Sequence, residues 1–198
     1  KGEYINTSKR LVTVTIGTFL LMLLVGLYSG YKAMVYHQKV NLKIEEYKKI
    51  FTTEFHKQTV SETGKMEIVG SYRRGAESSG DIDVIITSTN PAIFKNFVDD
   101  LIKIKVIQEV LSRGPTKCLV IAKIPGHTIS RRVDFLYTSP EEFPFAILYF
   151  TGSKIFNTVM RHEALAKELT MNEHGLYSLV GKKKGEKVSH NFTIEEDI

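Results

Sequence analysis

Two aspartates separated by one residue, Asp81 and Asp83, open an apolar run that ends at Thr87. If this run is a β-strand, its side chains alternate between two faces, so both carboxylates share one face while the apolar residues face a core. Neighbouring carboxylates repel each other, and burying them without a partner is costly. A divalent cation such as Mg²⁺, which prefers oxygen ligands, would relieve that repulsion. The pattern therefore indicates a metal site at the start of a strand.

A predicted anion-binding segment precedes the two aspartates. Gly70 and Ser71 supply backbone N–H groups and a hydroxyl at a helix start, and Arg74 adds a positive charge. Carboxylates, a metal and a phosphate cradle together predict phosphoryl or nucleotidyl transfer. An isolated Asp-x-Asp is more often a solvated strand end, but the Gly-Ser pair and the arginine make that interpretation the weaker one here.

A third carboxylate stands later in the chain. Arg132 and Asp134 are spaced by two within 128–137, a run with the alternation of a strand, so their side chains share a face. Sheet pairing that brings Asp134 beside Asp81 and Asp83 would complete a two-metal site. For Arg132 the alternative is an ordinary charge at a strand edge.

These motifs together resemble those of a known enzyme family. Residues 70–84 read Gly-Ser-Tyr-Arg-Arg-Gly-Ala-Glu-Ser-Ser-Gly-Asp-Ile-Asp-Val. This series is similar to the nucleotidyltransferase signature of the family X DNA polymerases, in its beta and lambda form. The stretches 131–134 and 149–157 match the family in order and spacing. The resemblance covers roughly residues 39–198.

The resemblance implies a role for each motif. Asp81 and Asp83 would bridge two Mg²⁺ ions, with Mn²⁺ as a substitute, and Asp134 would bind the ion that activates the primer 3′-hydroxyl. Arg132, near the primer end, and Arg161 would contact DNA. The incoming deoxynucleotide would be bound by the following residues: Gly70, Ser71, Arg74, Gly80, Tyr149, Phe150, Gly152 and Asn157.

Within this set, the resemblance gives the later block a special part. The aromatic pair Tyr149-Phe150 would underlie the sugar and disfavour a 2′-hydroxyl. The Gly152–Ser153 peptide bond is cis in relatives. Arg161 stands four residues after Asn157 and so shares its helix face.

The elements that must position these residues follow from periodicity. Apolar side chains at helical spacing predict a helix over 39–57 that packs on a sheet. A second helix begins at Asn90-Pro91 and a third covers 141–150. Alternation and turn residues predict strands over 66–69, from Asp81 to Thr87, and over 105–111, 117–124 and 128–137, with a small strand pair in 168–180.

The predicted fold class is α+β. A nucleotidyltransferase-type palm, with a mixed or antiparallel sheet flanked by helices, is followed by a small α+β subdomain. We divide the chain into an apolar N-terminal helix within 1–38, the palm over 39–140 and a nucleotide-selection subdomain over 141–198. The basic run 182–187 is interpreted as a solvated hairpin tip.

The apolar N-terminal segment admits three interpretations. No charged residue occurs within 11–31, and about 20 apolar residues span a bilayer, so a transmembrane helix is one of them. A divergent DNA-binding remnant is the second, and a mistranslated or spliced N-terminus is the third. Any membrane contact would involve only 11–31.

Composition sets further limits. The 198 residues are 42% hydrophobic and 25% charged, which is ordinary for a globular protein. A net charge of +5 and a pI of about 9.1 suit a polyanionic partner only mildly. The single cysteine, Cys118, excludes an internal disulfide and a cysteine-based zinc site. The chain begins at Lys1 and ends at Ile198, and we expect a fragment without a lyase domain.

The sequence therefore predicts a template-directed DNA polymerase that adds deoxynucleotides to the 3′-hydroxyl of gapped or primer-template DNA. Short-gap repair by a monomer in the nucleus or cytoplasm is the expected setting. One alternative is a nucleotidyltransferase acting on RNA ends or a small molecule. The other is an inactive, truncated DNA-binding remnant. The block 149–161 argues against the former, and the intact carboxylates with Arg74 argue against the latter.

Overall fold

The computed structural model describes residues 2–59, 64–76, 79–181 and 183–198, without side chains in 2–16 and 33–42. Two compact units make up the chain, Lys1–Leu42 and Lys43–Ile198. They are treated separately below.

The N-terminal unit is helical and belongs to helix α1 (Gly2–Gln58). The predicted apolar N-terminal helix is thus confirmed, and it continues without a break into the helix predicted over 39–57. Its described apolar side chains are exposed, Met22 at 74% and Tyr31 at 60%. Residues 11–16 of the predicted transmembrane segment lie outside the described side chains. Among the residues that are described, no helix is both long and apolar enough to cross a membrane.

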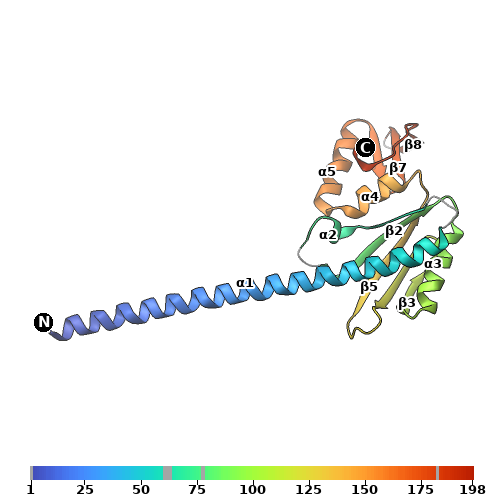
Figure 1. Ribbon diagram of the computed structural model, residues 1–198. Coiled ribbons are helices and arrows are strands. Elements are labelled where there is room, and N and C mark those ends of the chain that lie inside the picture. The colour runs from blue at the N-terminus through green and yellow to red at the C-terminus, as the bar shows by residue number, and fades with distance from the viewer. Residues whose placement is uncertain (1, 60–63, 77–78, 182) are drawn as a thin grey trace. The chain divides into compact units, whose positions relative to one another are not determined.

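The second unit is built on a mixed five-stranded sheet in the order β1-β2-β5-β4-β3 (Figure 1). Its strands are β1 (Gly64–Ile68), β2 (Ile82–Ser88), β3 (Ile107–Arg113), β4 (Lys117–Lys123) and β5 (Ser130–Thr138). Strands β2 and β5 run parallel, and the other neighbouring strands are antiparallel. The predicted sheet is therefore confirmed.

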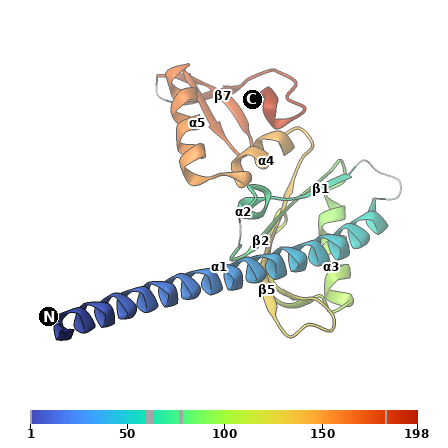
Figure 2. The ribbon, with the colours of Figure 1, turned by 60° about the vertical axis from the view of Figure 1, so that its left-hand side comes forward.

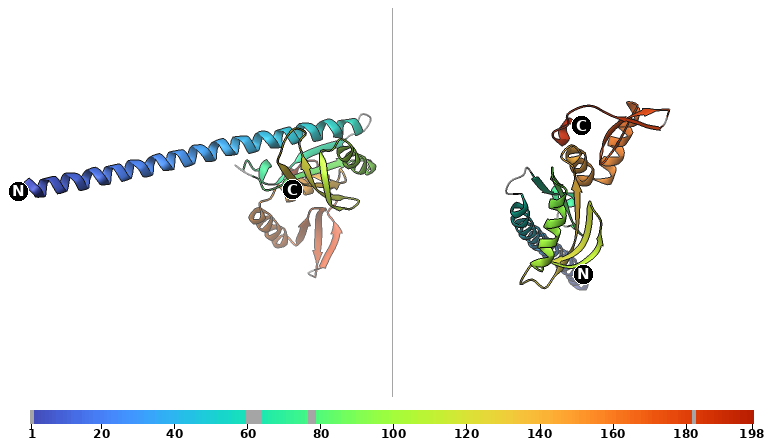
Figure 3. Two further views of the ribbon diagram at one scale, coloured as in Figure 1. Left: turned by 90° about the horizontal axis from the view of Figure 1, so that it is seen from below. Right: turned by 90° about the vertical axis from the view of Figure 1, so that its right-hand side faces the viewer.

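One face of this sheet is covered by α3 (Ala92–Lys103) and the last turns of α1 (Figure 3). Phe51 of α1 is fully buried and meets the rings of Phe97 and Phe135 edge-on, at centroid distances of 6.4 and 5.2 Å. The hydroxyl of Tyr47 donates a hydrogen bond to the carbonyl of Ala122 at 2.9 Å. This aromatic core fixes the sheet from one side.

The opposite face of the sheet carries the candidate chemistry. Side chains alternate along β5, so Asp134 points away from the core that Phe135 enters. The parallel register pairs Asp83 with Asp134. The topology thus brings together two carboxylates that lie 51 positions apart in the sequence.

A C-terminal subdomain follows the sheet. It contains α4 (Phe143–Thr151), α5 (Lys154–Ala166), a three-stranded sheet of β6 (Leu169–Asn172), β7 (Gly175–Val180) and β8 (Lys183–Lys187), and the 3₁₀ turn η1 (Glu195–Asp197). Helix α4 packs on the large sheet through Val69, Ile85, Ala146 and Ile147. The short helix α2 (Gly70–Arg73) lies next to α4 (Figure 2).

Strand β8 differs from the prediction of a solvated tip over 182–187. Residues 183–187 pair with β7 as a third strand, with Val180 opposite Lys183. Lysine, glycine and glutamate favour strands weakly. Pairing with β7, which no local pattern reveals, therefore decides this segment; residue 182 lies outside the described residues.

Candidate active site

The first wall of the site is a glycine turn pressed against a carboxylate. Gly70 has a φ of +68°, and a Cβ at this position would lie 2.5 Å from Oδ2 of Asp83. Only glycine allows both that backbone conformation and that approach. Next to it, the hydroxyl oxygens of Ser71 and Ser79 are 2.7 Å apart. The Gly-Ser turn predicted to cradle phosphate thus stands directly beside the predicted metal ligands.

The carboxylates themselves are electrostatically strained. Burial, and then the charges of Asp81 and Asp134, raise the pKa of Asp83 from its ordinary value to about 6. The register explains the effect, since Asp83 and Asp134 are direct neighbours across β2 and β5. Removing water and crowding like charges both disfavour an ionised carboxyl.

Arg132 compensates part of this negative charge. Its Nε and Nη2 atoms donate to the two carboxylate oxygens of Asp134 at 3.0 and 2.9 Å. The same Nη2 lies 3.3 Å from Oδ2 of Asp81. The sequence placed Arg132 near a primer end; in this structure its guanidinium is held by two of the three carboxylates.

A divalent cation suits the donor types at this place. Three carboxylates are hard oxygen ligands, and the repulsion that raises the pKa of Asp83 is of the kind a cation relieves. Yet in the described part of the chain no three His, Cys, Asp or Glu side chains are grouped so as to hold a metal ion. The predicted three-carboxylate site is therefore not assembled in this arrangement. The physical reason is Arg132, which occupies both oxygens of Asp134.

A cavity of about 580 Å³ opens next to these carboxylates. It gathers ten of the predicted site residues: Gly70, Ser71, Arg74, Asp81, Asp83, Tyr149, Phe150, Gly152, Asn157 and Arg161. Arg132, Asp134 and Gly80 are not among its described lining residues. Asp134 and Arg132 lie beside it through their contacts to Asp83 and Asp81, whereas Gly80 is exposed.

The second wall of the cavity comes from α4 and α5. The rings of Tyr149 and Phe150 meet edge-on at 5.0 Å, and the guanidinium of Arg161 lies 5.1 Å above the Tyr149 ring. The side-chain amide of Asn157 donates to the carbonyl of Tyr149 at 2.8 Å. The Gly152–Ser153 peptide bond is cis. This wall offers aromatic, amide and cationic groups, which suit a nucleoside better than a metal ion.

Two arginines tie the walls together. Arg74 donates to the carbonyl of Thr151 at the end of α4. Arg73 donates to the Thr151 hydroxyl at 2.9 Å and forms an ion pair with Glu195 of η1. The structure therefore places Arg74 at the cavity, as the sequence predicted, and adds a link to Glu195 that it did not predict.

Comparison with known proteins agrees with this geometry. Residues 43–140 match the family model described as DNA polymerase beta palm. Residues 146–198 match the one described as DNA polymerase beta thumb. The two matches follow each other along the chain and together account for most of it.

The chain belongs to the family X DNA polymerases.

Curated members of this family share the same region. DNA polymerase lambda of Rattus norvegicus is 34% identical over 121 residues, which are 56% of this chain and 21% of that protein. The DNA polymerase/3′-5′ exonuclease PolX of Bacillus subtilis is 34% identical over 112 residues, 57% of this chain and 19% of the relative. DNA polymerase lambda of Arabidopsis thaliana is 25% identical over 130 residues, 59% and 25% of the two chains. The chain thus spans about a fifth to a quarter of these relatives.

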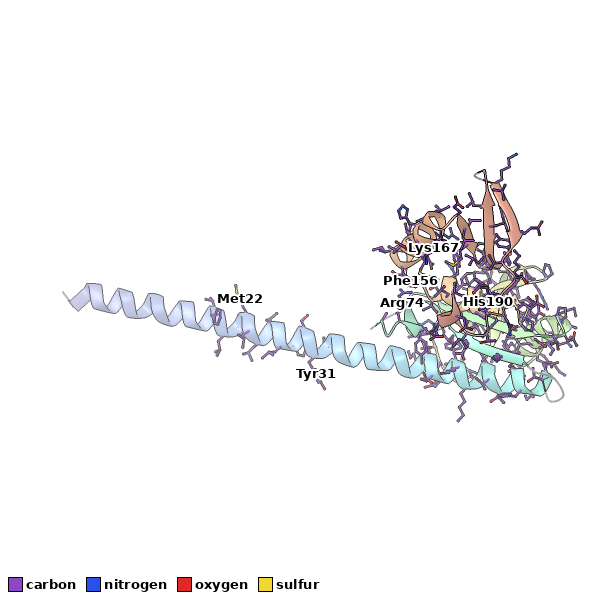
Figure 4. The ribbon with its side chains drawn as sticks, turned by 90° about the horizontal axis from the view of Figure 1, so that it is seen from above. Met22, Tyr31, Arg74, Phe156, Lys167 and His190 are labelled. Atoms are coloured by element: carbon purple, nitrogen blue, oxygen red, sulfur yellow. The ribbon has the colours of Figure 1, made fainter. Side chains whose placement is uncertain are left out.

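The cavity between palm and thumb also contains residues that sequence reasoning missed. Ser153, Lys154 and Thr158 line it together with the predicted ones (Figure 4 shows α5, with Phe156 labelled, and Arg74 of the palm). Each stands next to a predicted residue, Gly152 or Asn157, so adjacency was the available signal. Their exposure to the cavity depends on how α5 docks, which spacing alone does not give.

Proposed function

We propose that this region is the catalytic part of a DNA-directed DNA polymerase, which adds deoxynucleotides to a DNA 3′-hydroxyl under the direction of a template. One observation carries the proposal: a single cavity brings the palm carboxylates Asp81 and Asp83 opposite the thumb pair Tyr149 and Phe150. Carboxylates are what a metal-assisted phosphoryl transfer needs, and a flat aromatic wall is what a nucleoside needs.

In this proposal the palm handles the reacting atoms. Asp81, Asp83 and Asp134 hold two Mg²⁺ ions, or Mn²⁺ in their place, which would stabilise the negative charge on the primer oxygen and the phosphates. Arg132 releases Asp134 when the cations are held and then lies at the primer end. The backbone N–H groups of Gly70 and Ser71, with Arg74, bind the triphosphate. Gly80 belongs to the same segment.

The thumb handles selection of the nucleotide. Tyr149 and Phe150 lie under the sugar, and their bulk disfavours a 2′-hydroxyl. Asn157 and Arg161 face the minor-groove edge of the new base pair, where the acceptors are shared among bases, so they sense the shape of the pair. Gly152 allows the sharp turn between α4 and α5, with a φ of +68°.

The proposed setting is the filling of short gaps during DNA repair, by a monomer in the nucleus or cytoplasm. The substrates are gapped or primer-template DNA and a deoxynucleoside triphosphate. The relatives are named as DNA polymerases, which supports this class of substrate.

Primer extension on a duplex with a one-nucleotide gap tests the proposal. The reaction contains Mg²⁺ and the four deoxynucleoside triphosphates, and the full chain is compared with Asp134→Ala. Extension by the nucleotide complementary to the template, lost on the order of 10³-fold in the variant, is the expected result.

Two controls make the result interpretable. Asp99→Ala removes a carboxylate on α3 far along the chain from the site and should extend as the parent does. Ribonucleoside triphosphates should be used poorly. Incorporation that ignores the template base would favour a nucleotidyltransferase acting on other ends, and no incorporation by the parent would contradict the proposal.

A further inference from the structure

One cation of the cavity is unexplained by the contacts of the fold. Three cations are among the described lining residues: Arg74, Lys154 and Arg161. Arg74 donates to the carbonyl of Thr151, and Arg161 lies over the ring of Tyr149. The ammonium of Lys154 makes no hydrogen bond or ion pair with any described residue, and the side chain is exposed. Its charge is therefore available to a ligand in the cavity.

Helix stability does not explain this lysine either. Lys154 is the first residue of α5, and Ser153 caps the helix by accepting a hydrogen bond from the Phe156 N–H at 3.4 Å. The N-terminal end of a helix carries a partial positive charge, so an acidic residue stabilises it and a cation does not. No acidic residue stands in the first turn of α5. The position thus adds positive charge to an end that is already positive.

The cavity supplies the reason for such an arrangement. Lys154 lines the same space as Asp81 and Asp83, which repel an anionic ligand unless cations screen them. A ligand that carries phosphates gains from every cation that reaches it, and an ammonium can also lie over the face of a base.

We propose that Lys154 contacts the incoming nucleoside triphosphate and sets its affinity. The inference rests on the proposed function and adds a residue to it. Since the contact is made with the bound nucleotide before and during the reaction, it lowers the Michaelis constant and leaves the turnover number nearly unchanged. Loss of a charge-assisted contact of this kind weakens binding roughly tenfold.

Binding measurements on the full chain test this. The primer of a one-nucleotide-gapped duplex is terminated with a dideoxynucleotide, so that the nucleotide can bind but cannot react. The dissociation constant of the complementary nucleoside triphosphate is measured with Mg²⁺ by calorimetric titration, and that of the duplex by fluorescence anisotropy. The variants are Lys154→Gln, Lys154→Arg and, as the matched control, Lys167→Gln at the opposite end of α5 (Figure 4).

The expected result is a roughly tenfold weaker nucleotide affinity in Lys154→Gln, with the duplex affinity unchanged. Lys154→Arg keeps the charge and should retain most of the nucleotide affinity. Lys167→Gln should match the parent. Thermal unfolding of Lys154→Gln at or above the parental temperature would show that the loss is not a folding defect.

Two results would overturn the inference while leaving the proposed function intact. One is nucleotide affinity in Lys154→Gln equal to that of the parent. The other is a weaker duplex affinity with unchanged nucleotide affinity, which would assign the lysine to a DNA strand. A parent chain that binds no nucleotide would overturn both proposals together.

Discussion

The two walls of the cavity are built in different ways. The palm wall carries Asp83 and Asp134 on strands whose other face packs against a core in which Phe51 and Phe135 are fully buried. The thumb wall is α5, where Ala164 is the buried residue among those described, while Ile155 is 77% and Val159 54% exposed. One wall is fixed by packing, and the other is held chiefly at its ends.

This difference matches the division of labour that we propose. Groups that must hold reacting atoms lose activity when displaced by about 1 Å, so they belong on a rigid sheet. Groups that select a nucleotide gain from being able to close on it, and elements with few buried contacts open and close at low cost. The link from Arg73 to Glu195, which is polar and at the surface, suits a wall that moves.

The largest test of this contrast is a deletion in the palm core. Phe51→Ala should lower the free energy of unfolding by about 3–5 kcal/mol, because a fully buried ring leaves a cavity among Phe97 and Phe135. Phe156→Ala, in α5 and 40% exposed, should cost well under about 1 kcal/mol. Denaturant unfolding of both variants measures this, and equal losses would remove the contrast.

A second test separates the backbone of the glycine turn from its contact with the carboxylate. Gly70 and Gly75 both have positive φ, +68° and +72°, but a Cβ at Gly75 meets nothing within 4 Å. Gly75→Ala should therefore cost only the strained conformation, about 1–2 kcal/mol. Gly70→Ala should cost more and also displace Asp83, so primer extension should fall strongly in this variant alone.

If Gly75→Ala loses as much extension activity as Gly70→Ala, the turn matters through its conformation and not through the approach to Asp83. Circular dichroism at the assay temperature would show whether both variants remain folded.

A third test uses the strained carboxylate itself. The pKa of Asp83 is about 6 in the folded chain and 3.8 without its surroundings, so the folded state binds this proton more tightly. Its contribution to stability is full below pH 4 and is lost as the pH rises through 6. Without Mg²⁺, Asp83→Asn should thus unfold at a higher temperature than the parent at pH 7.5, and the gap should shrink toward pH 4.

The matched control has the opposite sign. Hydrogen bonds from Lys95 and Arg113 lower the pKa of Asp99, so its small contribution is present at neutral pH and lost in acid. Asp99→Asn should therefore unfold at a slightly lower temperature than the parent at pH 7.5. An Asp83→Asn variant that behaves like Asp99→Asn would contradict the account of charge crowding at the site.

The smallest expected effect concerns the thumb wall. Arg161→Lys keeps the charge but loses the flat guanidinium that lies over Tyr149. A stacked cation of this kind is worth about 0.5–1 kcal/mol, so the Michaelis constant for the nucleotide should rise roughly two- to fivefold. Steady-state extension measures it, and a large fall in the turnover number instead would place Arg161 at the reacting atoms.

Much of the fold was available from local pattern. Apolar residues at helical spacing identified the packed part of α1, including Phe51, because one buried helix face leaves a period that can be read along the chain. Alternation identified β4 and β5 for the same reason. Strand β8 was missed, since its lysines carry no strand pattern and its pairing partner β7 determines its conformation.

By itself, the sequence determined the chemistry of the site: a Gly-Ser turn, three carboxylates and an aromatic pair, with types and spacings that suit nucleotidyl transfer. Only the tertiary structure decided how these charges are paired. Arg132 binds Asp134 and Asp81, and Arg73 reaches Glu195 across 122 positions of the sequence. Such pairs depend on where folding brings two distant side chains, and nothing in the neighbourhood of either residue encodes that meeting. The exposed charge of Lys154 in the cavity became visible for the same reason.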